Sequence, residues 1–257
     1  MDSQILIFIF AIIMFISVIA FGYIPLSLDL SSDRLKQITA IGAGVLIGSA
    51  FLVIIPEALE TIEYSDEENS VKTSTIGLAI LSGFVLMLLL EVVGLPHAVH
   101  HDEDKDLLGM SATIGLLVHG AADGLAVGAS VSTGSEIGLI VFIAIMLHKG
   151  PAAFGLSSFL KHVGINDSRS KIYLLLFAIS SPIISILTFF ILKDTSYATD
   201  DNIGLALLFS AGTFIYVSTV DVLPEVHSHD HDHDPPVWFV IAGIILVFLV
   251  TLISHGS

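Results

Sequence analysis

Eight long apolar segments constrain the fold of this chain more than any other feature of its sequence. A helix needs about 20 mostly apolar residues to cross a bilayer, and each segment comes close to that length. The segments are 4–25, 37–56, 75–94, 108–131, 136–159, 172–192, 202–223 and 237–254. We therefore predict an all-α integral membrane protein of eight transmembrane helices, with a single transmembrane domain over residues 1–257.

The composition agrees with this class and excludes several others. Charged residues make up only 13% of the chain, where about a quarter is usual for a soluble domain. The net charge of −16 offers no basic surface, so we expect no nucleic-acid partner. The chain has no cysteine, which excludes thiolate metal sites and cysteine nucleophiles. The remaining ligand types suit divalent cations better than Cu(I).

The distribution of Lys and Arg predicts the orientation. With the N-terminus outside, the cytosolic loops hold Arg34, Lys36, Lys105, Lys161, Arg169 and Lys171, whereas the outer loops hold Lys72 and Lys193. Cytosolic loops are usually the richer in these residues. A multi-pass protein with both termini on the extracellular or lumenal side is therefore predicted.

Two polar clusters lie near the centres of the fourth and fifth segments. His119 and Asp123 are four residues apart, so they share one face of the fourth helix. His148 and Lys149 lie at a similar depth in the fifth, and Pro151 is predicted to kink that helix. A charge at a helix centre costs roughly 2.5–3.5 kcal/mol on insertion scales, so it is usually paired or functional.

Two imidazoles and a carboxylate at equal depth on adjacent helices indicate a divalent-metal site. We predict that His119, Asp123 and His148 are its ligands. The alternative is a structural network, in which Asp123 pairs with Lys149 and the histidines bond to the backbone. Two matched clusters favour the metal site over that network.

Two further acids are candidates for contacting a metal ion along its pathway. Asp221 lies inside the seventh segment, and Glu57 follows Pro56 at the end of the second. For each of them a solvated helix end is the alternative.

Histidine-rich loops are predicted on the cytosolic side, at residues 95–107 and 224–236. Their histidines are His97, His100, His101, His227, His229, His231 and His233. Such compositions are typical of metal binding, and the lack of tetrahedral preorganisation predicts weak sites. The alternative is a solvated loop whose histidines respond to pH.

A faint internal repeat relates the second and seventh segments. Ala43-Gly44 precedes Pro56-Glu57 in one, and Ala211-Gly212 precedes Pro224-Glu225 in the other. The spacing from Gly to Pro is 12 residues in both (56 − 44 and 224 − 212). Since these helices are predicted to run in opposite directions, we predict an inverted repeat of helices 1–3 and 6–8 around helices 4 and 5.

These motifs resemble the Zrt/Irt-like (ZIP) metal transporters, solute carrier family 39. The stretch 119–124, His-Gly-Ala-Ala-Asp-Gly, resembles the family's His-x-x-x-Asp-Gly motif, and the stretches 145–156 and 210–225 resemble the member 9 branch. The resemblance covers essentially the whole chain. It implies a ZIP-type bundle that moves zinc towards the cytosol through His119, Asp123 and His148, in the Golgi membrane, the plasma membrane or both.

The chain departs from the family pattern beside the predicted ligands. Gly120, Lys149, Ala152 and Ala153 stand where many members have polar, acidic or metal-binding side chains. A second metal position is therefore predicted to be absent. We hypothesise that the Lys149 ammonium takes the space and charge of that second cation.

The predicted function is transport of zinc as cargo, by a protein that is not an enzyme and has no catalytic cofactor. Two alternatives stay open, a metal-dependent membrane receptor with a structural metal site and an intramembrane zinc hydrolase. The sequence offers no third buried histidine and no His-Glu-x-x-His motif for the hydrolase. Expected partners are zinc, other divalent metal ions and the lipid bilayer, with a homodimer as an open alternative.

Overall fold

A computed structural model of the chain describes residues 2–28, 31–63, 71–94, 103–224 and 237–255, which are helical apart from short connections. The predicted all-α class is confirmed over this part of the chain. The helices are α1 (Ser3–Ser27), α2 (Ser32–Ser49), the π-helix η1 (Ala50–Ile54), α3 (Ile55–Glu63), α4 (Thr73–Gly94), α5 (Glu103–Thr133), α6 (Ser135–His162), α7 (Asp167–Leu192), α8 (Asp200–Tyr216), the π-helix η3 (Val217–Val222) and α10 (Val237–His255).

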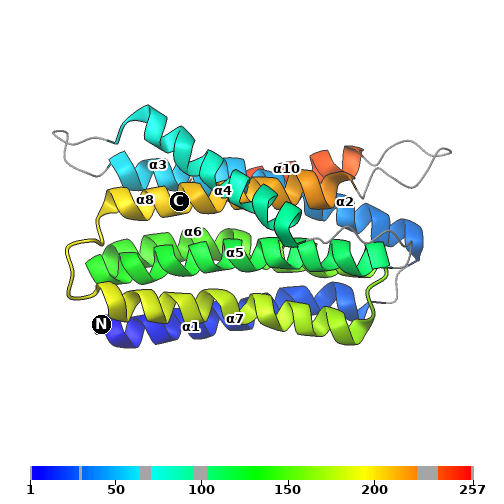
Figure 1. Cartoon of the computed structure of the whole chain (residues 1–257), viewed down its shortest axis with the longest axis horizontal. Coiled ribbons are helices and arrows are strands. Elements are labelled where there is room, and N and C mark those ends of the chain that lie inside the picture. The colour runs from blue at the N-terminus through cyan, green and yellow to red at the C-terminus, as the bar shows by residue number, and fades with distance from the viewer. Residues whose placement is uncertain (1, 29–30, 64–70, 95–102, 225–236, 256–257) are drawn as a thin grey trace.

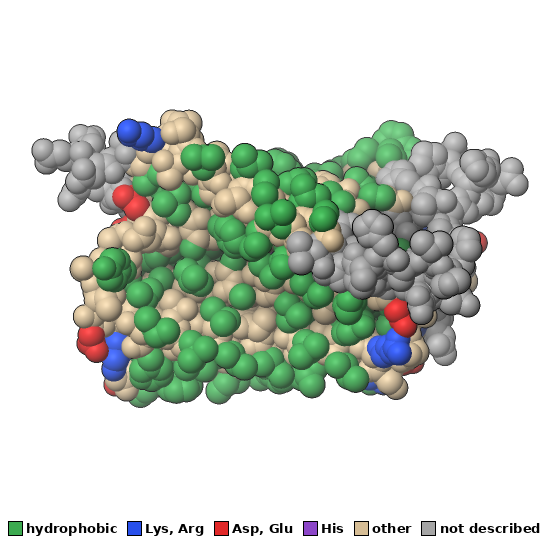
Figure 2. All heavy atoms as spheres, viewed as in Figure 1, with side chains coloured by type: hydrophobic (Ala, Val, Ile, Leu, Met, Phe, Trp, Pro, Cys, Tyr) green, Lys and Arg blue, Asp and Glu red, His purple; other side chains and the backbone are tan. Residues whose placement is uncertain are grey.

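Seven helical rods in the described residues are long and apolar enough to cross a membrane. They correspond to the first seven predicted segments, while the apolar part of α10, Val237–Leu252, is shorter. Figure 2 shows hydrophobic side chains over the flank of the molecule and charged side chains at its two ends. This distribution fits the predicted multi-pass membrane protein, and the eighth span stays a prediction.

Several helices extend beyond the apolar segments that predicted them. α2, η1 and α3 form one continuous helical rod from Ser32 to Glu63, and α5 begins at Glu103, inside the predicted loop 95–107. Hydropathy marks only the apolar part of a helix. The sequence at this end of α5 is also acidic, and acidic residues are generally favourable in the first turn of a helix because of the helix dipole.

The helices α5 and α6 form the centre of the bundle. α5 packs against α6, α7 and α8, whereas α6 packs against α1, α2 and α5. Figure 1 shows α5 and α6 between a tier of α1 and α7 and a tier that contains α2 and α8. The outer helices α4 and α10 pack mainly against α8 and α2. Side chains on the facing surfaces of α5 and α6 are consequently the most remote from lipid.

Each π-helical segment lies just before a proline. Proline lacks an N–H group, so it interrupts the normal ladder of helical hydrogen bonds. The N–H of Ile55, next to Pro56, donates to the carbonyl of Ala50, and that of Leu223, next to Pro224, donates to the carbonyl of Ser218. These bonds span five residues, so the prolines are accommodated by a wider helical turn rather than by a break.

Glycines allow two pairs of helices to approach closely in the same manner. A Cβ on Gly44 of α2 would lie 2.0 Å from the carbonyl oxygen of Val240 in α10. A Cβ on Gly212 of α8 would lie 2.0 Å from the carbonyl oxygen of Ile80 in α4. The contacts are reciprocal, since Gly243 meets the carbonyl of Ile41 and Gly83 meets that of Phe209. The close contact between α2 and α10 therefore resembles the close contact between α8 and α4.

Candidate metal centre

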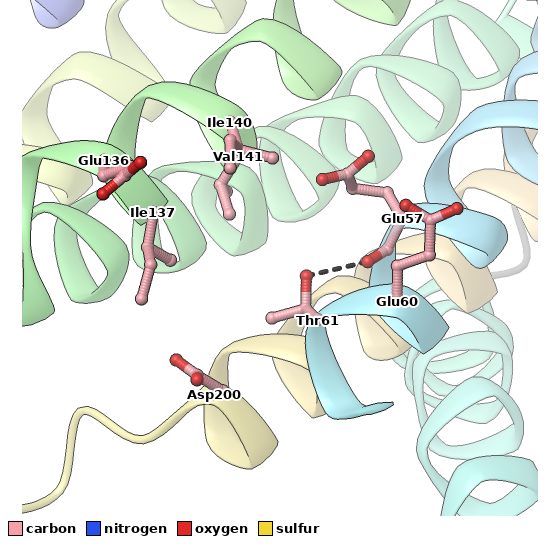
Figure 3. Close-up of a pocket in the computed structure, with 8 residues that line it drawn as sticks. All are labelled: Glu57, Glu60, Thr61, Glu136, Ile137, Ile140, Val141 and Asp200. Carbon is pink, nitrogen blue, oxygen red and sulfur yellow. Dashed lines mark hydrogen bonds between the residues drawn. The ribbon is translucent and has the colours of Figure 1, made fainter. Parts of the chain in front are cut away.

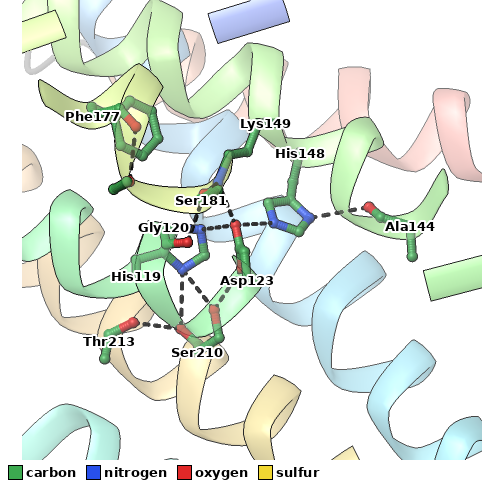
Figure 4. A network of polar contacts seen from close by, with 11 residues as sticks. His119, Gly120, Asp123, Ala144, His148, Lys149, Phe177, Ser181, Ser210 and Thr213 are labelled. Atoms are coloured by element: carbon green, nitrogen blue, oxygen red, sulfur yellow. Dashed lines mark hydrogen bonds and ion pairs between the residues drawn. The ribbon is translucent and has the colours of Figure 1, made fainter. Parts of the chain in front are cut away.

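The predicted ligands from α5 and α6 come together in the centre of the bundle. One nitrogen of His119, one nitrogen of His148 and one oxygen of Asp123 all lie within 4.8 Å of one another (Figure 4). His119 and Asp123 are fully buried, and His148 is 1% exposed. Within the part of the chain that the structure describes, this is the group with metal-binding geometry.

Each histidine is oriented by a hydrogen bond at its Nδ1 atom. His148 Nδ1 lies 3.1 Å from the carbonyl oxygen of Ala144, and His119 Nδ1 lies 3.3 Å from that of Ser210. Because a carbonyl only accepts hydrogen bonds, we infer that Nδ1 carries the proton in each neutral ring. The Nε2 lone pairs are then left for another partner. Phe214 stacks on the His119 ring, with centroids 4.1 Å apart, and fixes its plane.

Both Nε2 atoms face the same carboxylate oxygen. Asp123 Oδ2 lies 3.3 Å from Nε2 of His119 and 3.4 Å from Nε2 of His148. His119 Nε2 is buried and finds no hydrogen-bond partner in the described part of the chain, which is costly for a polar atom. A cation bound between the three atoms would satisfy them together. Two imidazole nitrogens and a carboxylate oxygen suit Zn²⁺ and other divalent first-row metals.

Lys149 contacts the same carboxylate oxygen as the two histidines. Its side chain is fully buried, and its Nζ lies 2.8 Å from Asp123 Oδ2. The structural-network alternative predicted this ion pair and the backbone bonds of the histidines, and both are present. The two interpretations are compatible, because bonds at Nδ1 leave Nε2 directed at the carboxylate.

Two serines that the sequence analysis did not single out complete the surroundings of the site. Ser210 of α8 donates a hydrogen bond to Asp123 Oδ1 at 2.8 Å, and its Oγ lies 2.8 Å from His119 Nδ1. Ser181 of α7 donates to the carbonyl of Gly120 at 2.6 Å and accepts a hydrogen bond from Lys149. Serines recur along these apolar helices, so their sequence positions alone did not distinguish these two.

A stripe of small residues on α5 brings α7 close to the site. Gly120, Gly124 and Gly128 recur at four-residue spacing, and all three face α7. A Cβ on Gly128 would lie 2.4 Å from the carbonyl oxygen of Ser185. This close approach allows Ser181 to reach Lys149 across the helix interface.

The predicted pathway acids lie apart from the site. Glu57 lines an open pocket of about 520 Å³, together with Glu60, Thr61, Glu136, Ile137, Ile140, Val141 and Asp200 (Figure 3). Asp221 is buried in η3, where the hydroxyl of Ser111 donates to it at 3.5 Å. Pro151 lies inside the continuous helix α6, and its kink stays a prediction. The histidines of both predicted loops lie outside the described residues.

The site lies between this pocket and Asp221. Val141 in the pocket and His148 are seven residues apart on α6, or about 10 Å along the helix axis. On α8, Asp200 lines the pocket and Ser210 contacts the site, and Asp221 lies further along the same rod, in η3. Acidic groups therefore stand on both sides of the buried ligands.

Comparison with known proteins decides the family. The family model described as ZIP Zinc transporter matches residues 4–107 and 96–251. This chain belongs to the ZIP zinc transporter family. The resemblance to that family is thereby confirmed, and the family consists of zinc transporters rather than enzymes, which supports the transporter over the hydrolase.

ZIP proteins of several vertebrates are similar to this chain over most of its length. Zinc transporter ZIP9 of Micropogonias undulatus is 41% identical over 255 residues, which cover 81% of this chain and 82% of the relative. Zinc transporter ZIP9-A of Xenopus laevis is 41% identical over 248 residues with the same coverage. Zinc transporter ZIP13 of Pongo abelii is 27% identical over 202 residues, 75% of this chain and 58% of the relative. The similarity to the member 9 branch is confirmed.

Proposed function

We propose that this ZIP family member carries zinc, and related divalent metal ions, across a membrane towards the cytosol. The proposed transport site is the group of His119, Asp123 and His148. The observation that carries this proposal is the convergence of two Nε2 atoms and Asp123 Oδ2 at a fully buried point in the bundle centre. A carrier that exposes this point alternately to the two sides would move the ion without an open channel.

The acidic pocket is the proposed entrance. Its carboxylates Glu57, Glu60, Glu136 and Asp200 attract cations, and it opens at the end of the bundle where α6 and α8 begin. In the orientation predicted from the Lys and Arg residues, this end and both termini face outwards. Asp221 is the proposed contact on the cytosolic side of the site.

The inverted repeat is part of the proposal, and two observations support it. The reciprocal glycine contacts of α2 with α10 and of α8 with α4 would be exchanged by an axis that relates helices 1–3 to helices 6–8. The segments η1 and η3 stand at matching places, each just before the proline of the sequence repeat. Such an arrangement gives a carrier two similar halves that exchange roles between outward-facing and inward-facing states.

Zinc flux through purified protein tests this proposal. The protein is placed in liposomes that contain a fluorescent zinc indicator, and uptake is compared with that of His119→Ala, His148→Ala and a control, His162→Ala. His162 lies at the C-terminal end of α6, away from the site. We expect uptake by the wild type and the control, and its loss in the two site variants. Metal binding without uptake would instead favour the receptor, and lipid hydrolysis would favour the hydrolase.

The two predicted histidine-rich loops are proposed as weak metal-binding segments on the cytosolic side. Replacing their seven histidines by serine should leave the zinc dependence of uptake unchanged and remove only low-affinity binding. Residence in the Golgi or plasma membrane and assembly as a homodimer stay predictions. Immunofluorescence of the full chain and cross-linking in the membrane would test them.

A further inference from the structure

A single oxygen atom of the proposed site is shared between the metal-binding groups and a fixed cation. Asp123 Oδ2 lies 2.8 Å from Lys149 Nζ, 3.3 Å from His119 Nε2 and 3.4 Å from His148 Nε2. Any metal ion held by the two histidines and this oxygen therefore enters the immediate surroundings of an ammonium group. Like charges this close repel strongly where water is excluded.

The ammonium group is itself held in place by neighbouring groups. It donates a hydrogen bond to Ser181 Oγ, whose own proton is directed at the carbonyl of Gly120. Its Nζ also lies 5.2 Å from the centre of the Phe177 ring, within the range of a cation–π interaction. Lys149 is thus a positioned part of the site, because its charge has an anion, an acceptor and an aromatic face as partners.

The pairing solves a problem that any carrier with a buried carboxylate meets. A metal ion neutralises Asp123 on the loaded step of the cycle, but the carrier must also return without metal. An unpaired carboxylate inside the bundle is strongly unfavourable. Lys149 supplies the compensating charge from within the same protein, with no ion taken from either side of the membrane.

We propose that Lys149 is a tethered counter-ion that neutralises Asp123 while the site carries no metal and yields Asp123 Oδ2 to the metal when it binds. The inference rests on the proposed transport function and adds two consequences to it. Competition from the ammonium weakens metal binding and favours release. The neutral Asp123–Lys149 pair allows the empty carrier to return.

These consequences can be tested by measuring net uptake and exchange of zinc separately. Net uptake of zinc into zinc-free liposomes requires return of the empty carrier. Exchange of labelled external zinc for unlabelled internal zinc does not, because the carrier returns loaded. In Lys149→Met, which retains chain length and loses the charge, we expect net uptake to fall by about tenfold or more. The rate of exchange should stay within about threefold of the wild-type rate, and exchange should saturate at a lower zinc concentration.

A matched control removes a lysine charge from the same helix outside the site. Lys161 donates to the backbone carbonyls of Pro25 and Leu28. Lys161→Met should therefore retain the wild-type ratio of net uptake to exchange. An unchanged ratio in Lys149→Met, or equal loss of both activities in a variant that elutes and melts like the wild type, would overturn the inference.

A second variant decides the matter if Lys149→Met fails to fold. Ser181→Ala retains the charge of Lys149 but removes one of its anchors, so zinc should displace the ammonium more easily. We expect the half-saturating zinc concentration for exchange to fall several-fold, and an unchanged or higher value would overturn the inference. Wild-type protein that shows neither net uptake nor exchange would refute the proposed function itself, whatever the variants do.

Discussion

The Ser210→Ala substitution tests how the surroundings of the proposed site hold its ligands. The Ser210 hydroxyl donates to Asp123 Oδ1 at 2.8 Å and lies 2.8 Å from His119 Nδ1, which places it between two of the three ligands. Alanine removes one hydrogen bond that the hydroxyl donates to an ionised carboxylate and one that it accepts from the imidazole. The ring retains the carbonyl of Ser210, 3.3 Å from Nδ1, as an acceptor.

The expected magnitude follows from these contacts. A hydrogen bond to a charged group contributes about 1.5–3 kcal/mol, whereas the loss at His119 is partly offset by the backbone carbonyl. Since about 1.4 kcal/mol corresponds to a tenfold change in affinity, zinc should bind roughly 10–100-fold more weakly. Changes of this size are typical of groups that orient metal ligands without touching the metal.

The assay is zinc-dependent uptake in liposomes, with direct binding measured by calorimetry on the same preparations. Ser157→Ala is the matched control, because the Ser157 hydroxyl is also buried but has no hydrogen-bond partner among the described residues. The control should retain the wild-type half-saturating zinc concentration. An unchanged value in Ser210→Ala would refute the argument that this serine orients the ligands.

Two further predictions concern helix packing and the proposed entrance. Gly212→Ala should destabilise the protein by about 1–3 kcal/mol, because its Cβ would lie 2.0 Å from a carbonyl of α4. In Gly77→Ala the added Cβ meets no atom of the described residues within 4 Å, so the melting temperature in detergent should be unchanged or higher. Equal melting temperatures of the two variants would contradict this. Glu136→Gln in the acidic pocket should slow uptake about two- to tenfold at low zinc and low ionic strength, and less at high salt. A loss that is independent of salt would contradict electrostatic attraction at the entrance.

The helices were predictable because membrane insertion imposes a length and a polarity that can be recognised in sequence. Hydropathy carries no information on the polar continuation of a helix, so the extension of α5 to Glu103 was missed. It also does not distinguish α-helical from π-helical hydrogen bonding. The segments η1 and η3 were therefore not predicted, although the prolines at 56 and 224 were recognised.

The proposed ligands were predictable because their spacing and depth are properties of single helices. His119 and Asp123 share a face at i and i+4, and His148 lies at the same depth on the adjacent helix. Ser181 and Ser210 come from α7 and α8, and their directions depend on how those helices are rotated against α5. The acidic pocket likewise combines α3, α6 and α8, whose ends meet only in the folded bundle.

X-ray absorption at the zinc edge tests the central claim, that His119, Asp123 and His148 hold the transported ion. The protein for this measurement has the seven histidines of the two loops replaced by serine, so that bound zinc reports on the buried group. We predict a zinc ion with two imidazole nitrogens and carboxylate oxygen, and the loss of one imidazole in His148→Ala. An imidazole count that is the same with and without His148 would contradict the account.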